Sequence, residues 1–199
     1  MKQRLSTYLH ENELKVLLRL PDQRTLIGKR DYAILKLMLL AGLRRDEICN
    51  LTASNLQVNG KEVDLYVVGK GDKERKLPLT DSDLISSILS YWKHAGIAPN
   101  SFDPFFKTHG HGTRKSGNKI TWRVIQTTID KYISMLKLPR KITPHSFRHT
   151  YLTRLIQKGA DLETVRKLAG HSSIATTQTY LHTDEDRMRK AVETLTIGE

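Results

Sequence analysis

The chain has 199 residues, of which 38% are hydrophobic and 27% are charged, so it is long enough for one domain with a hydrophobic core. No apolar run reaches the roughly 18 residues that a membrane-spanning helix needs, and the N-terminus lacks the apolar core of a signal peptide. A single cysteine, Cys49, excludes an internal disulfide framework and a multi-cysteine zinc site. These features favour a cytoplasmic protein.

The charge of the chain is unevenly distributed. Its 33 Lys and Arg residues outnumber 21 Asp and Glu residues, which gives a formal net charge of +12. The stretch between Asp103 and Asp161 holds 12 Lys and Arg residues and a single acid, Asp130. Such a concentrated basic excess favours a polyanionic partner such as nucleic acid. A ribosomal protein, a membrane-surface protein and a merely solvated basic surface are alternatives.

Helices dominate the expected N-terminal part. Apolar residues at helical spacing predict a first helix over 6–20, a second over 29–40 and a short third over 43–51. The second is apolar on nearly every side from Tyr32 onward, and we therefore place it in the core.

Two strand-like runs follow, at 63–68 and 75–79. The glycine-punctuated turn between them predicts an antiparallel hairpin. A helix capped by Thr80 or Asp81 then runs to His94.

The remaining sequence is again helical. It begins with a polar, glycine-rich and basic loop at 109–119, which we expect to be exposed. The fold class is therefore mainly α with a small antiparallel β-sheet (α+β). The predicted helices of this part span 121–136, 144–158, 161–169, 172–180 and 184–195.

The most informative polar residues lie in the segment TPHSFRH at 143–149. His145 and Arg148 share one face in the first turns of a predicted helix, where unpaired backbone N–H groups favour an anion. An arginine can hold two phosphate oxygens, and a histidine can donate to another or move a proton. A capping His145 and an ion-paired Arg148 fit the same spacing. A zinc site at His145 and His149 lacks an obvious third ligand, so we expect no metal.

Two further cations stand out. Arg44 lies between the apolar Leu43 and Ile48, at the edge of a buried element, where either Glu47 or an incoming phosphate could pair with it. Lys70 is flanked by glycines in the hairpin turn, from which its ammonium could reach a ligand or stay solvated. The turn is not a nucleotide-binding loop, because the GxxxxGK[ST] spacing is missing.

Two residues near the C-terminus carry weak signals when each is considered alone. His171 follows a helix-ending Gly170, where a histidine commonly caps or packs. Tyr180 lies in a threonine-rich stretch, where a tyrosine more often packs with a wet hydroxyl than acts as a nucleophile.

Together, four segments resemble the tyrosine recombinase (phage integrase) family, and most of all the catalytic domains of Xer-type recombinases. The segments are GLRRDEI, VVGKGDKERKLPL, TPHSFRHTYLTRLIQKG and LAGHSSIATTQTYLH, and the resemblance covers about residues 6–190. It implies the tyrosine recombinase catalytic-domain fold. It also implies a complete catalytic set: Arg44, Lys70, His145, Arg148, His171 and Tyr180.

The resemblance implies that Tyr180 attacks a DNA phosphodiester and forms a covalent 3′-phosphotyrosyl link, with no cofactor. The cationic side chains and a histidine can neutralise the charge that builds on the phosphate without a metal or ATP. Lys70 is then the acid for the leaving 5′ oxygen, His145 a candidate proton acceptor for Tyr180, and His171 a hydrogen-bond donor to the phosphate.

The expected function is site-specific DNA recombination or integration. The expected partner is double-stranded DNA with a specific recombination site, bound as a homotetramer, with a monomer or weak oligomer in its absence and no membrane contact. One alternative is a type IB-like DNA-relaxing or junction-resolving enzyme. Another is a non-catalytic DNA-binding protein on the same fold, which the complete catalytic set disfavours.

The chain departs from the family at its N-terminus. Full-length integrases usually carry a separate helical DNA-binding domain before the catalytic domain, whereas here the first catalytic-domain helix is expected almost at Met1. We expect residues 1–199 to be a single catalytic domain, either a fragment or a short recombinase, with a C-terminal helix or tail at 184–199. Further DNA contacts are expected at Arg45, Lys73, Arg75, Arg114, Lys115 and Lys119.

DNA cleavage should survive EDTA, because every group expected to stabilise charge is a side chain. The measurement is covalent adduct formation on DNA in EDTA and after addition of magnesium or zinc. Activity that disappears in EDTA and returns with a metal would contradict the mechanism and favour a site at His145 and His149.

Overall fold

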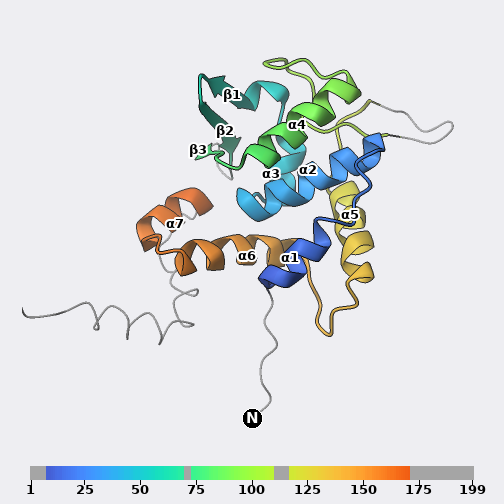
Figure 1. The fold of residues 1–199 in the computed structure, drawn as a ribbon. Coiled ribbons are helices and arrows are strands. Elements are labelled where there is room, and N and C mark those ends of the chain that lie inside the picture. Colours follow the sequence, from blue (N-terminus) through green and yellow to red (C-terminus); the bar gives the residue numbers. More distant parts are fainter. Residues whose placement is uncertain (1–7, 70–72, 110–116, 171–199) are drawn as a thin grey trace, which may run out of the picture.

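The computed structural model describes residues 8–69, 73–109 and 117–170 (Figure 1). It confirms a mainly α fold with a small antiparallel sheet. No helix within these ranges is long and apolar enough to span a bilayer. In chain order the elements are α1 (Glu11–Leu17), α2 (Leu26–Leu40), α3 (Arg45–Asn50), η1 (Ala53–Asn55), β1 (Leu56–Asn59), β2 (Glu62–Val68), β3 (Glu74–Pro78), α4 (Ser82–Ala95), α5 (Trp122–Met135), α6 (Pro144–Gln157) and α7 (Leu162–Ala169).

The central element is α2, which packs against α4, α5 and α6 (Figure 1). Its residues 30–39 are buried on every side, which confirms the core position expected for it. The helix begins three residues earlier than predicted, because the Thr25 hydroxyl accepts a hydrogen bond from the Gly28 amide (3.0 Å) and caps it there.

A buried ammonium joins α2 to the start of α4. Lys36 is only 6% exposed, and its Nζ donates to carboxylate oxygens of Asp81 (2.7 Å) and Asp83 (2.6 Å). Asp81 also accepts the Leu84 amide, which confirms it as the cap of α4. A buried cation is costly unless it is paired, so this contact fixes the two helices relative to each other.

The three strands form an antiparallel sheet in the order β1-β2-β3. Leu65 of β2 lies opposite Leu56 of β1 and Leu77 of β3, and all three side chains are buried. The hairpin of β2 and β3 was predicted, but β1 was not. Its LQVN sequence is too short to show alternation, and it is a strand because β2 pairs with it.

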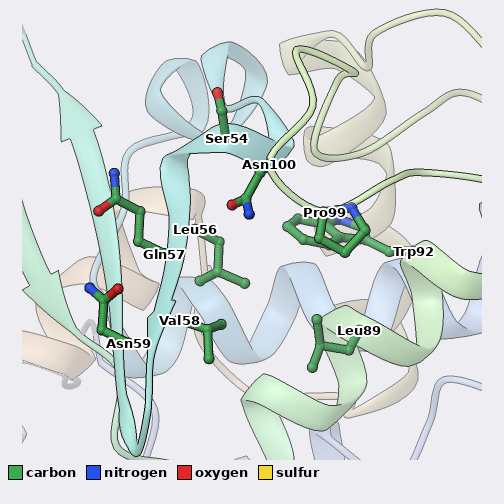
Figure 2. Close-up of a pocket in the computed structure, with 9 residues that line it drawn as sticks. All are labelled: Ser54, Leu56, Gln57, Val58, Asn59, Leu89, Trp92, Pro99 and Asn100. Atoms are coloured by element: carbon green, nitrogen blue, oxygen red, sulfur yellow. The ribbon is translucent and has the colours of Figure 1, made fainter.

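A surface pocket of about 470 Å³ lies between β1 and α4 (Figure 2). Leu56 and Val58 of β1 lie opposite Leu89 and Trp92 of α4 across it. None of its nine lining residues is ionisable, so the pocket offers no acid, base or cation for chemistry on a phosphate.

The first helix is shorter than the predicted 6–20. It begins only after His10, whose amide donates to the Glu13 carboxylate (2.8 Å). Immediately before it, the Leu9 amide donates to the Thr150 hydroxyl of α6 (2.9 Å), so tertiary contacts hold this segment outside the helix. The other described helices lie close to their predicted positions, whereas 172–180 and 184–195 lie outside the described residues.

Gly42 lies in the connection from α2 to α3 and is closely covered by α6. Its φ is +62°, a left-handed conformation, and a Cβ added there would lie 2.2 Å from Cδ1 of Tyr151. Both its backbone conformation and this close approach therefore require glycine.

Gly42→Ala should lower the free energy of unfolding by about 3 kcal/mol, because the left-handed conformation costs about 1–2 kcal/mol and overpacking adds about 1–3 kcal/mol. Gly96→Ala is the matched control, since Gly96 has φ +63° but no atom within 4 Å of an added Cβ. It should show only the conformational cost. Equal losses for the two variants in urea denaturation would show that contact with Tyr151 is unimportant.

Candidate active site

A small pocket of about 90 Å³ brings together three residues of the predicted catalytic set, Arg44, His145 and Arg148. Arg44 is the residue before α3, and the other two lie in the first turns of α6. The pocket thus opens at the N-terminal end of α6, where backbone N–H groups and the helix dipole favour a bound anion.

The start of α6 has the predicted residues. Thr143 is the N-cap, Pro144 the first helical residue, and the Thr143 amide donates to the Ser146 hydroxyl (3.1 Å). Because the helix begins there, His145 and Arg148 lie one turn apart and line the same pocket.

Arg148 is buried, with 6% of its surface exposed. One terminal nitrogen donates to the Gly42 carbonyl (2.7 Å) and the other to the Ala169 carbonyl at the end of α7. Both of these partners are backbone carbonyls. Arg148 is thereby held in place by backbone atoms of two different segments.

A buried carboxylate, Glu47, joins Arg44 to Arg75. It accepts two hydrogen bonds from the Arg75 guanidinium (both 2.9 Å), one from the Arg44 guanidinium (2.9 Å) and one from the Arg44 amide (2.7 Å). Burial alone raises the pKa of Glu47, but the hydrogen bonds and charge of Arg75 and Arg44 outweigh it and hold the pKa below its ordinary value. Glu47 is therefore ionised and fixes both guanidinium groups.

Arg75 lies inside the protein rather than on an exposed DNA-facing surface. Its side chain is 10% exposed, and besides binding Glu47 its Nε donates to the Leu168 carbonyl of α7 (3.2 Å). The sequence named Arg75 as a further DNA contact, and the structure shows instead which protein groups bind its guanidinium. The physical reason is that the buried Glu47 carboxylate requires a cation and the last carbonyls of α7 require donors.

Arg75 and Arg148 together fix the end of α7. They bind the carbonyls of Leu168 and Ala169, and the helix ends at Gly170, whose φ is +63°. His171, the next residue, and Tyr180 lie outside the described residues.

The base of the predicted Lys70 turn lies beside the same cluster. The Gly69 amide donates to the Lys73 carbonyl (2.9 Å), and a Cβ added to Gly69 would lie 3.8 Å from the Glu47 carboxylate. Lys70 itself lies outside the described residues.

The other predicted DNA contacts have different settings. Lys73 is exposed, and Lys119 is exposed with its Nζ donating to the Asn50 side chain (2.7 Å). Arg45 lines the pocket. Arg114 and Lys115 lie outside the described residues.

His145 and His149 face different surroundings. His145 lines the pocket, whereas the ring of His149 lies against that of Tyr8, with centroids 5.5 Å apart, and burial lowers its pKa. In the ranges that the structure describes, no three His, Cys, Asp or Glu residues form a cluster able to hold a metal ion.

Some residues of the site were not predicted. Gly42 supplies a carbonyl to Arg148, and its only sequence signal is a glycine after a helix. Trp122 at the start of α5 lies next to Arg45 and was not singled out either. The sequence signal that could have identified Trp122 is its position directly before a basic residue, Arg123.

Comparisons with known proteins identify the family of the chain. The family model described as "Phage integrase family" matches residues 7–187. The chain is 32% identical to the tyrosine recombinase XerC of Pelotomaculum thermopropionicum over 96% of its length, and 36% identical to the tyrosine recombinase XerD of Lacticaseibacillus casei over 90%.

A solved structure has the same fold. The XerH site-specific recombinase bound to its palindromic difH substrate matches with a TM-score of 0.77 and 25% identity, covering 96% of this chain and 54% of XerH. The chain spans 61% of the XerC relative and 59% of the XerD relative, so it corresponds to part of each.

Glu47→Gln should lower the free energy of unfolding at neutral pH by about 3 kcal/mol, because it leaves the buried Arg75 without a counter-charge. The folded-state pKa of Glu47 is lowered, so its contribution is present above the unfolded-state pKa and is lost as the pH falls through the folded-state pKa. Denaturation at several pH values should show the two proteins converging in acid.

The control is Glu163→Gln, which removes an exposed pair with Arg166 and should change stability little. A Glu47→Gln protein as stable as the unmodified protein at every pH would contradict this account of the buried carboxylate.

Proposed function

Because the chain belongs to the phage integrase (tyrosine recombinase) family, we propose that it cleaves and rejoins double-stranded DNA at specific sites through a covalent 3′-phosphotyrosyl intermediate. The observation that carries this proposal is the pocket in which Arg44, His145 and Arg148 meet. Two guanidinium groups and an imidazole can together bind the anionic oxygens of a phosphodiester.

The two guanidinium groups supply charge stabilisation. Attack on a phosphodiester builds negative charge on the non-bridging oxygens, and arginine side chains bind such oxygens in a planar, directional manner. Arg148 is held by carbonyls and Arg44 by Glu47, so both are in position before DNA arrives. The two arginine side chains then need to move little as negative charge develops on the phosphate.

The roles of the remaining residues in the mechanism are inferred from family membership. Tyr180 is the nucleophile, and since an unperturbed phenol has a pKa of about 10, it needs a proton acceptor, for which His145 is our candidate. Lys70 protonates the leaving 5′ oxygen, and His171 donates to the phosphate. The energy of the broken bond is kept in the phosphotyrosyl link, so rejoining requires neither ATP nor a cofactor.

The substrate and assembly follow the same reasoning. The XerH structure is a complex with its recombination site, which supports a specific DNA site as the partner here. We propose a homotetramer on that site, a monomer or weak oligomer without it, and action in the cytoplasm. Residues 1–199 then act as one catalytic domain with a tail at 184–199, and Lys73, Arg114, Lys115 and Lys119 contact DNA. Relatives named as recombinases favour strand exchange over DNA relaxation.

Tyr180→Phe should abolish covalent adduct formation while DNA binding persists, because the change removes one oxygen and nearly no packing area. The assay uses a pool of nicked duplexes of random sequence, which traps the adduct, followed by peptide mapping. An adduct formed by the Tyr180→Phe protein would show that another residue is the nucleophile.

Two further variants separate chemistry from binding. Arg148→Ala should also abolish the adduct, an effect of several kcal/mol on the barrier, and should weaken binding because it removes a phosphate ligand. Tyr151→Phe keeps a buried ring and should stay active.

A further inference from the structure

Trp122, the first residue of α5, is a large aromatic residue at the surface. Its exposed fraction is 48%, and the guanidinium groups of Arg45 and Arg123 lie 5.6 and 5.4 Å from its ring centroid. These are cation–π distances, so the ring restricts where the two cations can lie.

Arg45 is held by α5 in a second way. Its Nη1 donates to the Gln126 side-chain oxygen (2.9 Å), and the Gln126 amide in turn donates to Asp130 (2.9 Å). Gln126 is one turn along α5 from Trp122, so one face of this helix holds the guanidinium at two points. Gln126 is neutral, and this hydrogen bond therefore leaves the charge of Arg45 uncancelled.

Arg45 also lines the pocket that contains Arg44, His145 and Arg148. The pocket is small, about 90 Å³, so it has room for a small group such as one phosphate and not for several neighbouring nucleotides. A DNA strand carries one phosphate per about 3.4 Å of helix axis, so the phosphates that flank the bound one lie outside the pocket. Arg45 lines the pocket beside the Asp46 carboxylate, and its guanidinium is held by Trp122 and Gln126 of α5.

Building on the proposed function, we propose that Trp122 and Gln126 are positioning residues that hold Arg45 to bind a backbone phosphate flanking the one in the pocket. Fixing a flexible arginine in advance lowers the conformational entropy lost on binding. Through this contact, α5 also sets how the DNA strand enters the pocket.

The test measures how the dissociation constant for an intact, random-sequence duplex depends on salt. Each phosphate contact contributes about 0.9 to the slope of log affinity against log salt. Arg45→Met should reduce that slope by about 0.9. Trp122→Leu removes no charge, yet it should also reduce the slope, because it releases Arg45.

A double variant identifies which cation Trp122 positions. Arg45→Met combined with Trp122→Leu should show no greater loss of slope than Arg45→Met alone. Trp122→Phe keeps an aromatic face and should restore most of the slope. Arg123→Met is the matched control, and Trp122→Leu in that background should still reduce the slope.

An unchanged slope in Arg45→Met would overturn the phosphate contact. An unchanged slope in Trp122→Leu, or additive losses in the double variant, would overturn the positioning role. Circular dichroism checks that each variant is folded. The slope requires no cleavage, so it is independent of the adduct assay: an unmodified protein that forms no adduct would refute the proposed function, not this contact.

Discussion

The buried carboxylate of Glu47 is the interaction on which the site depends. An ionised group at 5% exposure is tolerated only with close counter-charges, and here Arg44 and Arg75 supply them. Since Arg75 also binds the Leu168 carbonyl, one acid determines how the start of α3, strand β3 and the end of α7 come together. The same carboxylate offsets part of the positive charge that would otherwise make neighbouring guanidinium groups repel one another.

The two pocket arginines are held by different chemistry. Arg44 is bound by a carboxylate and its side chain remains 38% exposed, whereas Arg148 is 6% exposed and is bound by the carbonyls of Gly42 and Ala169. Neither arrangement needs DNA in order to form. The site therefore has the preorganised charge that is effective against a developing negative charge, because little reorganisation remains to be made.

Electrostatics acts at two ranges in this molecule. The net charge of +12, concentrated in the stretch that includes α5 and α6, attracts a polyanion over distance and is screened by salt. Close to the pocket, individual cations are instead fixed by Glu47, by backbone carbonyls and by the Trp122 ring. The buried helix α2 positions these cations relative to one another, since it packs against both α5 and α6 (Figure 1).

Several elements of this fold could be predicted from short-range sequence patterns alone. The cap at Thr143 with Pro144, the cap at Asp81, the buried second helix and the hairpin follow from residues close together in the chain. The TPHSFRH motif, one of those that mark the family, lies at the start of α6. Only tertiary structure decided that Arg75 lies inward, because its partners are 28 and 93 positions away. The strand β1 and the late start of α1 likewise depend on pairing with β2 and on a bond to Thr150, contacts that no local pattern encodes.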